Sequence, residues 1–437
     1  MAFQIDFSKY DELLEKSYVK KYGRVSQVVG LTIESEGPDV NVGRKCFIRT
    51  ASHAEPVTAE VVGFKHNKIL LMPLGDMSGV GPGSVVEASD MPLSVNIAED
   101  ILGRVLDGLG EPMDGLGPLR NSKSYPVTNP PPDPLKRNMI RTPLSLGVKA
   151  IDGLLTIGRG QRVGIFAGSG VGKSTLMGMI ARNTSADINV IALIGERGRE
   201  VREFIENDLG EEGLARSVVV VATSDRPALE RLKAAQVATS IAEFFRDKGR
   251  DVLFLMDSLT RYAMAQREIG LAIGEPPVSR GYTPSVYSVM PKLLERAGCS
   301  ESGSITGLYT VLVDGDDLTE PVTDTARGIL DGHIVLNRAI ASRNQYPAID
   351  VLASVSRVMS AIVTPEHKDA ANKFKKTMAV YASNEDLINI GAYAKGSNPE
   401  VDYAIDVHNT VLEFLTQDTH AKFEYEDVVN MLIEIVS

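Results

Sequence analysis

The residues in this chain best suited to chemistry form a glycine-rich turn followed by a lysine and two hydroxyl residues. The apolar run Val163–Phe166 enters the turn, which continues into a helix pattern as Ala167, Gly168, Ser169, Gly170, Val171, Gly172, Lys173, Ser174 and Thr175. Glycines let backbone N–H groups converge on one anion, and a helix turns its positive end toward the same point. Lys173 would reach the β- and γ-phosphates, and the Ser174 hydroxyl would bind Mg²⁺. The segment predicts a site for a nucleoside triphosphate with Mg²⁺.

One position departs from the usual phosphate-loop pattern. Ala167 stands where the pattern G-x-x-x-x-G-K-[ST] has its first glycine. A glycine-rich turn could also serve only to join a strand to a helix. The adjacent Lys173 and Ser174 at the helix start favour phosphate binding over that alternative.

Two carboxylates follow neighbouring apolar runs and would complete a hydrolytic site. Glu196 comes after Val190–Ile194, within the sequence GERGRE, and is placed to act on the attacking water. A solvated charged loop is the alternative for that cluster. Asp257 follows Val252–Met256, where phosphate-loop enzymes need a carboxylate for Mg²⁺. Asp257 could also cap the next helix, and the two roles are compatible.

Composition limits the class of protein. The chain has 437 residues, a formal net charge of −11 and two cysteines. Its length suggests two or three domains, and the acidic balance argues against general nucleic-acid binding. Cys46 and Cys299 offer no disulfide framework and no zinc spacing, so no metal besides Mg²⁺ is expected. The sequence shows neither a signal peptide nor a membrane span, which predicts a cytoplasmic protein.

The chain divides into four predicted parts. Residues 1–20 carry an apolar stripe and predict an amphipathic helix, covered either by this chain or by a partner helix. Residues 21–93 alternate short β-rich runs with glycine and proline turns, which predicts a small β-barrel. Residues 94–362 form the α/β part; its alternating pattern begins after the proline-rich segment 129–134, which should lie extended across a surface. Residues 363–437 predict a helical domain, with candidate helices at 373–382, 402–415 and 425–435.

The central part predicts a doubly wound α/β domain with a mostly parallel sheet. Its apolar runs suit parallel strands that are buried on both faces. These runs are Val163–Phe166, Val190–Ile194, Val218–Val221, Val252–Met256 and Tyr309–Val313. The site is expected at the carboxyl ends of the strands.

Taken together, these motifs resemble the catalytic β-type subunit of rotary ATP synthases and its relatives. The resemblance covers most of the chain and rests on AGSGVGKST, GERGRE, LMDSLTRYA, GYTPSV and YPAIDVLASVSRV. Within that superfamily, the stretches 255–270 and 304–336 look most like the flagellar and virulence type III protein-export ATPases. The resemblance implies a RecA-like central domain and Mg²⁺-dependent ATP hydrolysis.

The resemblance also implies roles for single residues. Glu196 would activate water, Arg197 would support it, Asp257 would associate with Mg²⁺, and Arg261 would lie close to the γ-phosphate. Arg357 matches the arginine finger offered to the nucleotide of an adjacent subunit, although a surface salt bridge is the alternative. Because one chain carries Lys173, Glu196 and Arg357, a homohexameric ring could work from one gene product.

By the same resemblance, Tyr346 lies under the adenine ring. Tyr393 is a candidate for the other side of the base, with an ordinary core tyrosine as the alternative. The acidic loop 314–320 lacks the glycine of an EF-hand, because its sixth position is Thr319. In the resembling family this loop faces a central pore, where it would meet a stalk-like protein.

The predicted function is therefore ATP hydrolysis that delivers or unfolds protein substrates at a flagellar type III export gate. Expected partners are a regulator on the N-terminal helix, a central stalk, exported protein–chaperone complexes, and the membrane export gate, which the ring would join peripherally. A virulence secretion ATPase is the nearest alternative. A Rho-like RNA translocase would need a basic, aromatic groove, which residues 23–92 lack. A non-catalytic rotary subunit is disfavoured by the presence of both Lys173 and Glu196.

Overall fold

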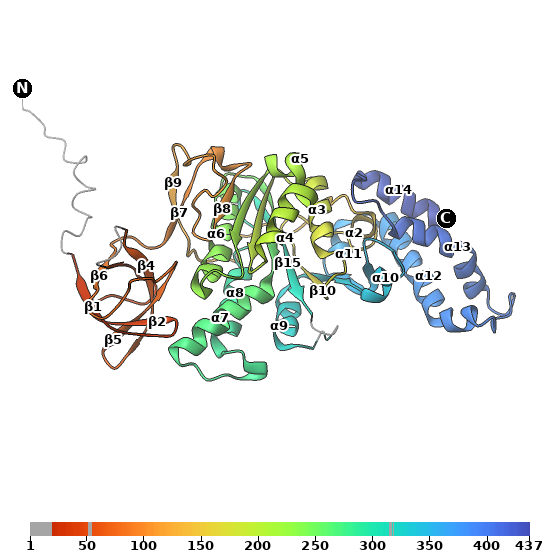
Figure 1. Ribbon diagram of the computed structural model, residues 1–437. Coiled ribbons are helices and arrows are strands. Elements are labelled where there is room, and N and C mark those ends of the chain that lie inside the picture. The colour runs from red at the N-terminus through yellow and green to blue at the C-terminus, as the bar shows by residue number, and fades with distance from the viewer. Residues whose placement is uncertain (1–19, 51–54, 314–316, 318) are drawn as a thin grey trace, which may run out of the picture.

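The computed structural model describes residues 20–50, 55–313, 317 and 319–437. It shows a barrel at one end, a layered α/β domain in the middle and helices at the other end (Figure 1). This order confirms the predicted architecture. Of the predicted N-terminal helix, only Lys20 lies within the described residues, and most of the acidic loop 314–320 also lies outside them. The predicted domain bounds at residues 93 and 362 stay predictions.

The barrel is closed and antiparallel. Its strands are β1 (Tyr22–Val29), β2 (Thr32–Glu36), β3 (Lys45–Arg49), β4 (Val57–Lys65), β5 (Lys68–Pro73) and β6 (Val85–Ala88), in the order β1-β2-β5-β4-β3-β6. Side chains alternate along each strand, so one set fills the interior with residues such as Ile33, Ile48 and Val61. Closure leaves no unpaired strand edge, which lets this short-stranded unit form its own core.

A connecting region leads from the barrel into the central domain. It contains β7 (Ser94–Ile97), which pairs with β9 (Lys123–Pro126), the short helix η2 (Glu99–Ile101), and β8 (Val105–Asp107). A buried ion pair, with 2.7 Å between Lys233 Nζ and Glu60 Oε2, joins the barrel strand β4 to the helix α6 (Ala228–Asp247) of the central domain. The barrel is thereby tied directly to the domain that follows it.

The central sheet contains nine strands, with the main order β17-β16-β10-β15-β13-β11-β12-β8. These are β10 (Arg162–Ala167), β11 (Ile188–Ile194), β12 (Ser217–Ala222), β13 (Asp251–Asp257), β15 (Ser304–Leu312), β16 (Gly332–Leu336) and β17 (Ile349–Ser356), besides β8 and the short β14 (Gly298–Cys299). All five apolar runs predicted as strands are confirmed. The sequence analysis missed β8, β14, β16 and β17, which are short or less uniformly apolar.

Both faces of this sheet are buried, as expected for a doubly wound domain. In β13, Phe254 and Met256 belong to one core cluster, while Leu253 and Leu255 belong to the other. The first cluster includes residues of α6, α7 (Leu259–Ile273) and α8 (Pro284–Leu294). The second includes α2 (Lys149–Leu154), α3 (Lys173–Asn183) and the C-terminal helices. Helices on both faces therefore fix the strand ends that carry the site.

The remaining helices of the central domain are short. They are α4 (Gly198–Glu203), η3 (Phe204–Leu209), α5 (Gly210–Ala215), η4 (Ser279–Gly281), α9 (Pro321–Ile329), α10 (Arg338–Ser342) and α11 (Met359–Ile362). The helix α4 begins directly after Arg197, so it follows the loop that carries Glu196.

The last strand runs against the others. β17 pairs antiparallel with β16, with Leu336 opposite Ile349 and Gly332 opposite Ser356. Because β16 is parallel to β10, β17 returns the chain from the carboxyl edge of the sheet to its amino edge. Residues just before and just after β17 therefore lie at opposite edges.

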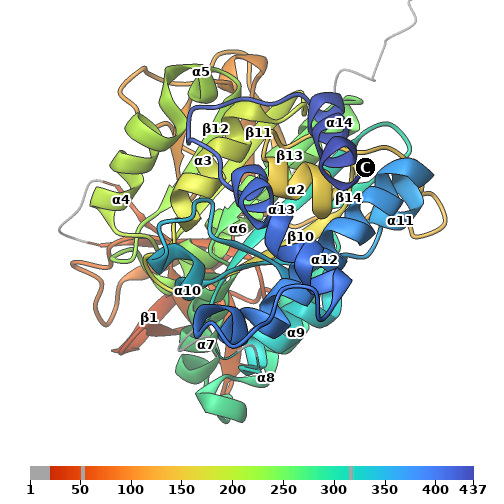
Figure 2. The same cartoon turned by 90° about the vertical axis from the view of Figure 1, so that its right-hand side faces the viewer.

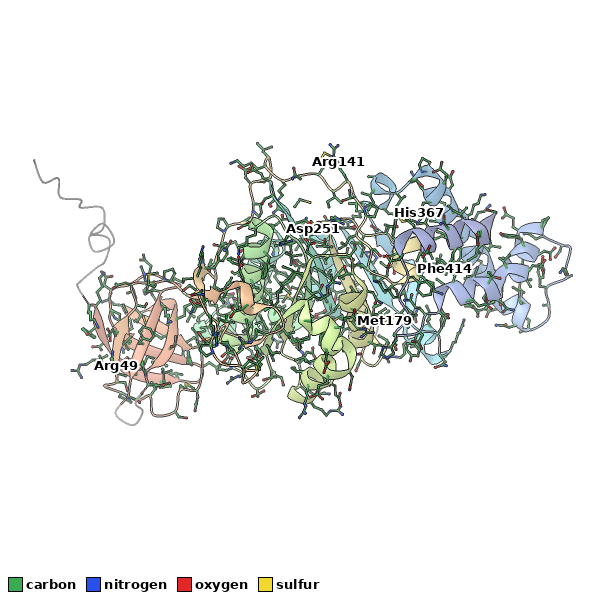
Figure 3. All side chains as sticks on the ribbon, turned by 90° about the horizontal axis from the view of Figure 1, so that it is seen from above. Arg49, Arg141, Met179, Asp251, His367 and Phe414 are labelled. Atoms are coloured by element: carbon green, nitrogen blue, oxygen red, sulfur yellow. The ribbon has the colours of Figure 1, made fainter. Side chains whose placement is uncertain are left out.

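The C-terminal part consists of α12 (Pro365–Asn389), α13 (Pro399–Leu415) and α14 (Tyr425–Val436). These helices lie next to α2 of the central domain (Figure 2). His367 Nε2 lies 2.7 Å from Gly153 O, and Phe414 packs against Phe374, at the junction visible in Figure 3. The predicted helical domain is confirmed. In the part of the chain that the structure describes, no helix is both long and apolar enough to cross a membrane.

Candidate active site

The phosphate loop leaves β10 and enters α3 as predicted. Ala167 is the last residue of β10, and its side chain is buried in the core. Its methyl group is tolerated because this position is extended strand and not part of the turn. Gly170 and Gly172 have φ angles of 78° and 88°, which other residues rarely adopt. The two glycines therefore allow the backbone to curl around an anion in front of α3.

Lys173 lies between two carboxylates. Its Nζ is 2.5 Å from Asp257 Oδ1 and 3.8 Å from Glu196 Oε1. Asp257 ends β13, and Glu196 follows Gly195 after β11, the neighbouring parallel strand. The three side chains are largely buried, with exposed fractions of 13%, 5% and 15% for Lys173, Asp257 and Glu196. The structure thus brings the predicted phosphate lysine, water-activating residue and metal-associated carboxylate together at one sheet edge.

Glu196 is held in an environment that resists its ionisation. Burial, followed by repulsion from Asp257, raises its pKa to about 7, although Lys173 opposes the shift. Among the described residues, Glu196 Oε1 has no hydrogen-bond partner. A buried acceptor with a pKa near neutrality is suited to hold or receive a proton from a water molecule.

Glu200 is a site residue that the sequence analysis did not single out. It shares a hydrogen bond with Glu196. Burial tends to raise the pKa of Glu200, but the bond with Glu196 and the charge of Arg197 lower it below its ordinary value. The pattern GERGRE contained the signal, because Glu200 lies in the first turn of α4, four residues after Glu196 in the preceding loop.

The two arginines expected near Glu196 differ in position. Arg197 has 76% of its side chain exposed and pairs with Glu200 at 2.9 Å, so it points toward solvent in this structure. Arg261 lies in the first turn of α7 and packs on Gly195, where a Cβ atom would come within 2.9 Å of Arg261 Cβ. Within the described chain, Arg261 Nε is buried without a hydrogen-bond partner. Arg261 therefore keeps a donor available beside the carboxylate cluster.

Two further side chains orient Asp257 and the helix after it. Thr310 is fully buried on β15, and its hydroxyl donates to Asp257 Oδ1 at 2.7 Å. The hydroxyl of Ser258, not Asp257, caps α7 by accepting from the Arg261 N–H at 3.2 Å. Asp257 is therefore not occupied as a helix cap. Only the strand order, with β15 beside β13, could have identified Thr310.

The donor set fits Mg²⁺. The Asp257 carboxylate and the Ser174 hydroxyl at the start of α3 are oxygen ligands, which Mg²⁺ prefers together with phosphate oxygens and water. The unpartnered Oε1 of Glu196 would accept a hydrogen bond from such a water. Among the described residues, no group of three or more His, Cys, Asp or Glu side chains is arranged to hold a metal ion. A Mg²⁺ ion bound here would therefore need phosphate oxygens or water molecules as further ligands.

Tyr346 lies beside the phosphate loop. A Cβ atom on Gly172 would meet the Tyr346 ring at 3.5 Å, and Tyr346 is 39% exposed. Its carbonyl accepts from the Gln417 N–H at 2.9 Å, so the loop between α13 and α14 is its neighbour. An exposed ring at this place can stack on a base bound in front of α3.

The structure does not bring Tyr393 to this site. Tyr393 lies in the turn between α12 and α13, at the end of the molecule remote from α3 (Figure 1). Its hydroxyl bonds the Asn398 carbonyl and the Asp402 carboxylate, both at 3.0 Å. The prediction of a base contact was wrong for this fold, because Tyr393 secures the entry to α13 instead.

Arg357 lies at the amino edge of the sheet. Its N–H donates to Asp331 O at 3.0 Å, and its exposed side chain donates to Arg327 O at 3.1 Å. The phosphate loop follows the opposite end of the six-residue strand β10, roughly 20 Å away along the strand direction. Arg357 therefore cannot serve the phosphate loop of its own chain in this fold.

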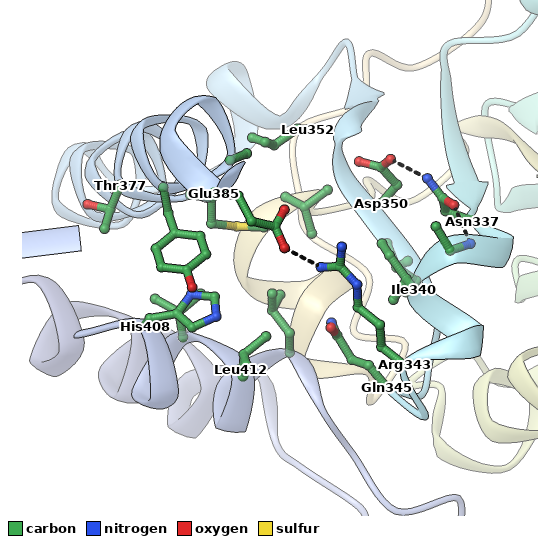
Figure 4. Close-up of a pocket in the computed structure, with 18 of the residues that line it drawn as sticks. Asn337, Ile340, Arg343, Gln345, Asp350, Leu352, Thr377, Glu385, His408 and Leu412 are labelled. Atoms are coloured by element: carbon green, nitrogen blue, oxygen red, sulfur yellow. Dashed lines mark hydrogen bonds and ion pairs between the residues drawn. The ribbon is translucent and has the colours of Figure 1, made fainter. Parts of the chain in front are cut away.

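A separate cavity of about 280 Å³ lies between the central domain and the C-terminal helices (Figure 4). Arg343 pairs with Glu385 of α12 at 2.9 Å there, and Tyr381 stacks on His408. None of the described residues 167–175 lines it. The cavity is therefore distinct from the phosphate site.

Three family profiles match the chain. The nucleotide-binding domain of the ATP synthase alpha/beta family matches residues 147–356, the beta-barrel domain of that family matches 25–90, and the T3SS EscN ATPase C-terminal domain matches 363–434. These ranges cover the barrel, the central sheet and the C-terminal helices described above.

Curated relatives and solved structures agree with these profiles. The chain is 57% identical to the flagellum-specific ATP synthase of Bacillus subtilis (strain 168), over 95% of each chain. It is 52% identical to the type 3 secretion system ATPase of Xanthomonas euvesicatoria, over 97% of this chain and 96% of that one. A structure of the assembled ATPase EscN in complex with its central stalk EscO, from the enteropathogenic E. coli type III secretion system, superposes with a TM-score of 0.88. It is 46% identical and covers 95% of this chain and 100% of its own. The chain therefore belongs to the ATP synthase α/β family and, within it, to the ATPases of flagellar and type III secretion export.

Proposed function

We propose that this chain forms a homohexameric ring that hydrolyses Mg²⁺-ATP and prepares protein substrates for flagellar type III export. The observation that carries the proposal is the division of the site between opposite edges of one sheet. Lys173, Glu196 and Asp257 meet at the carboxyl edge, and Arg357 lies at the amino edge. A complete site then needs two copies of the chain.

The residues at the carboxyl edge divide the work of hydrolysis. The curled backbone at Gly170 and Gly172 and the Lys173 ammonium bind the phosphates. Ionised Glu196 orients a water molecule and accepts its proton, while Arg261 donates to the γ-phosphate from beside Gly195. Ser174 and Asp257 would hold Mg²⁺, which would neutralise charge on the phosphate oxygens. Arg197 is exposed and supports this site through Glu200.

Arg357 completes the site of a neighbouring copy. An arginine finger supplied in trans stabilises the charge that develops on the transferred phosphoryl group. The exposed position of Arg357 leaves its guanidinium accessible to another subunit, and EscN is described as an assembled ATPase. Both observations support a ring built from one kind of chain.

Partners follow from the same relatives. The EscN complex with its central stalk EscO supports a stalk-like partner in the pore for this ring. We include a regulator on the N-terminal helix, exported protein–chaperone complexes and peripheral attachment at the membrane export gate, with the ring in the cytoplasm. The flagellar assignment is supported by the 57% identity to a flagellum-specific relative, against 52% to the secretion-system relative given above.

The pKa of Glu196 predicts the pH dependence of activity. Because Glu196 acts in its ionised form and its pKa is raised to about 7, kcat/KM for Mg²⁺-ATP should fall as the pH drops below that value. Glu200 contributes less to this raised pKa than burial and Asp257 do, so the profile of Glu200→Gln should shift modestly to lower pH. Steady-state rates between pH 5.5 and 8.5 measure both. An inflection that stays fixed in Glu200→Gln would contradict the contribution of Glu200 to this titration.

Thr310 should tune Mg²⁺ dependence. Thr310→Val removes the donor to Asp257 while keeping the side-chain shape, so the Mg²⁺ concentration for half-maximal activity should rise about tenfold, with little change in kcat at saturation. Thr310→Ser keeps a hydroxyl and serves as the matched control. Equal Mg²⁺ curves for Thr310→Val and wild type would contradict the role of this bond.

Mixed rings test the finger in trans. Arg357→Ala should reduce turnover by roughly 10³–10⁵-fold, and Glu196→Gln should also inactivate the chain. Mixing the two inactive variants before assembly should restore activity, because some interfaces then join an intact Glu196 to an intact Arg357. The control mixes Arg357→Ala with the double variant Arg357→Ala/Glu196→Gln, which cannot form such an interface. No recovery in the first mixture would exclude action in trans.

Export in cells tests the flagellar assignment. A strain lacking this gene should not release filament protein into the medium or swim, and the wild-type gene should restore both, whereas Glu196→Gln should restore neither. Immunoblots of culture supernatant and motility assays provide the readout. Normal filament export in the deletion strain would contradict the assignment.

A further inference from the structure

The loop 416–424, which joins α13 to α14, is hydrogen-bonded to the central domain at the end of α3. We call α3, which follows the phosphate loop, the phosphate helix. Arg182 and Asn183, at the end of α3, donate to the carbonyls of Thr419 (2.5 Å) and Ala421 (3.3 Å). The Gln417 N–H donates to Tyr346 O at 2.9 Å. One loop of the C-terminal part therefore contacts both the phosphate helix and Tyr346.

Gln417 makes the most complete set of these contacts. Its Oε1 accepts from the Lys149 N–H at 2.9 Å, and its Nε2 donates to Gly147 O at 2.9 Å and to Ala421 O at 3.0 Å. Only 6% of Gln417 is exposed. Both amide hydrogens and the amide oxygen are thus used inside the protein, which fixes the side chain in one orientation.

The surface that receives Gln417 is itself rigid. Asp152 is fully buried and its carboxylate accepts from the N–H groups of Leu146 and Gly147, both at 2.9 Å, and from the Ser145 hydroxyl at 2.8 Å. These bonds hold the chain at Gly147 in place. The Gly147 carbonyl is therefore held in place as a partner for Gln417.

Tyr346 connects this network to the nucleotide. Its carbonyl is bound by Gln417, and its ring lies against Gly172 of the phosphate loop. The Tyr346 ring is partly exposed. The backbone carbonyl of Tyr346 accepts a hydrogen bond from the backbone N–H of Gln417, in the loop between α13 and α14. Displacement of Gln417 would release the backbone that sets where the ring stands.

We infer that Gln417 is a positioning residue that holds Tyr346 against the base of the bound nucleotide. This inference rests on the proposed hydrolysis of Mg²⁺-ATP and on the predicted contact between Tyr346 and adenine. By this inference, the C-terminal helical part contributes to nucleotide affinity. Its contribution depends on the base of the nucleotide and not on the phosphates. Gln417 acts through Tyr346 and does not touch the reacting atoms.

The test compares a ligand that has a base with one that has none. Gln417→Met removes the amide at similar length, and Gln417→Glu places a carboxylate oxygen beside the carbonyls of Gly147 and Ala421. Both variants should bind Mg²⁺-ATP about five- to tenfold more weakly in calorimetry, a loss in the range of base stacking on an aromatic ring. Binding of inorganic tripolyphosphate should change less than about twofold, because the phosphate loop is untouched.

A double-mutant cycle shows whether Gln417 acts through Tyr346. Tyr346→Ala should weaken ATP binding at least as much as Gln417→Met, and the double variant should lose nothing further. KM for ATP should rise with kcat preserved in Gln417→Met. Equal losses for ATP and tripolyphosphate, or additive losses in the double variant, would overturn the inference. If Tyr346→Ala binds ATP normally, the predicted contact between Tyr346 and adenine fails instead.

Hydrogen exchange on the wild-type protein tests the same point without a substitution, should the variants fail to fold. ATP binding should slow exchange at residues 415–421 more than tripolyphosphate does, because only ATP engages Tyr346. Equal protection by the two ligands would overturn the inference.

Discussion

The site depends on one ammonium group held between two carboxylates at the edge of a buried parallel sheet. Lys173 contacts Asp257 at 2.5 Å and lies 3.8 Å from Glu196, and all three side chains are largely buried. Lys173 and the Thr310 hydroxyl both bond the Asp257 carboxylate, whereas Glu196 lies farther from the Lys173 ammonium. Burial, followed by repulsion from Asp257, raises the pKa of Glu196 to about 7. A phosphate group arriving at Lys173 would enter an arrangement that already separates a metal-binding carboxylate from a proton acceptor.

The direction of the last strand decides how many chains a site needs. β17 is antiparallel to its neighbour, so it carries the chain from Tyr346 near the phosphate loop to Arg357 at the far edge. Had β17 been parallel to β16, its end would have lain beside the chain's own nucleotide. Sheet topology within one chain therefore supports our proposal that a complete site requires a second subunit.

The C-terminal helices are connected to the central domain by specific hydrogen bonds near Tyr346. The side chain of Gln417 joins their connecting loop to Gly147 and Lys149, and its backbone joins the loop to Tyr346. In addition, Arg343 pairs with Glu385 of α12 at the interdomain cavity in Figure 4. The C-terminal part therefore contacts both Tyr346 and the end of α3.

The sequence by itself determined the phosphate loop, the strands around it and the carboxylates Glu196 and Asp257. These features are local, because glycine placement, an apolar run and the residue after it fix them within a few positions. Only the tertiary structure decided that Arg197 faces solvent, that Tyr393 lies far from the base, and that Thr310 and Gln417 support the site. Those outcomes depend on strand order, strand direction and loop docking between residues far apart in the chain, and no short-range pattern encodes such pairings.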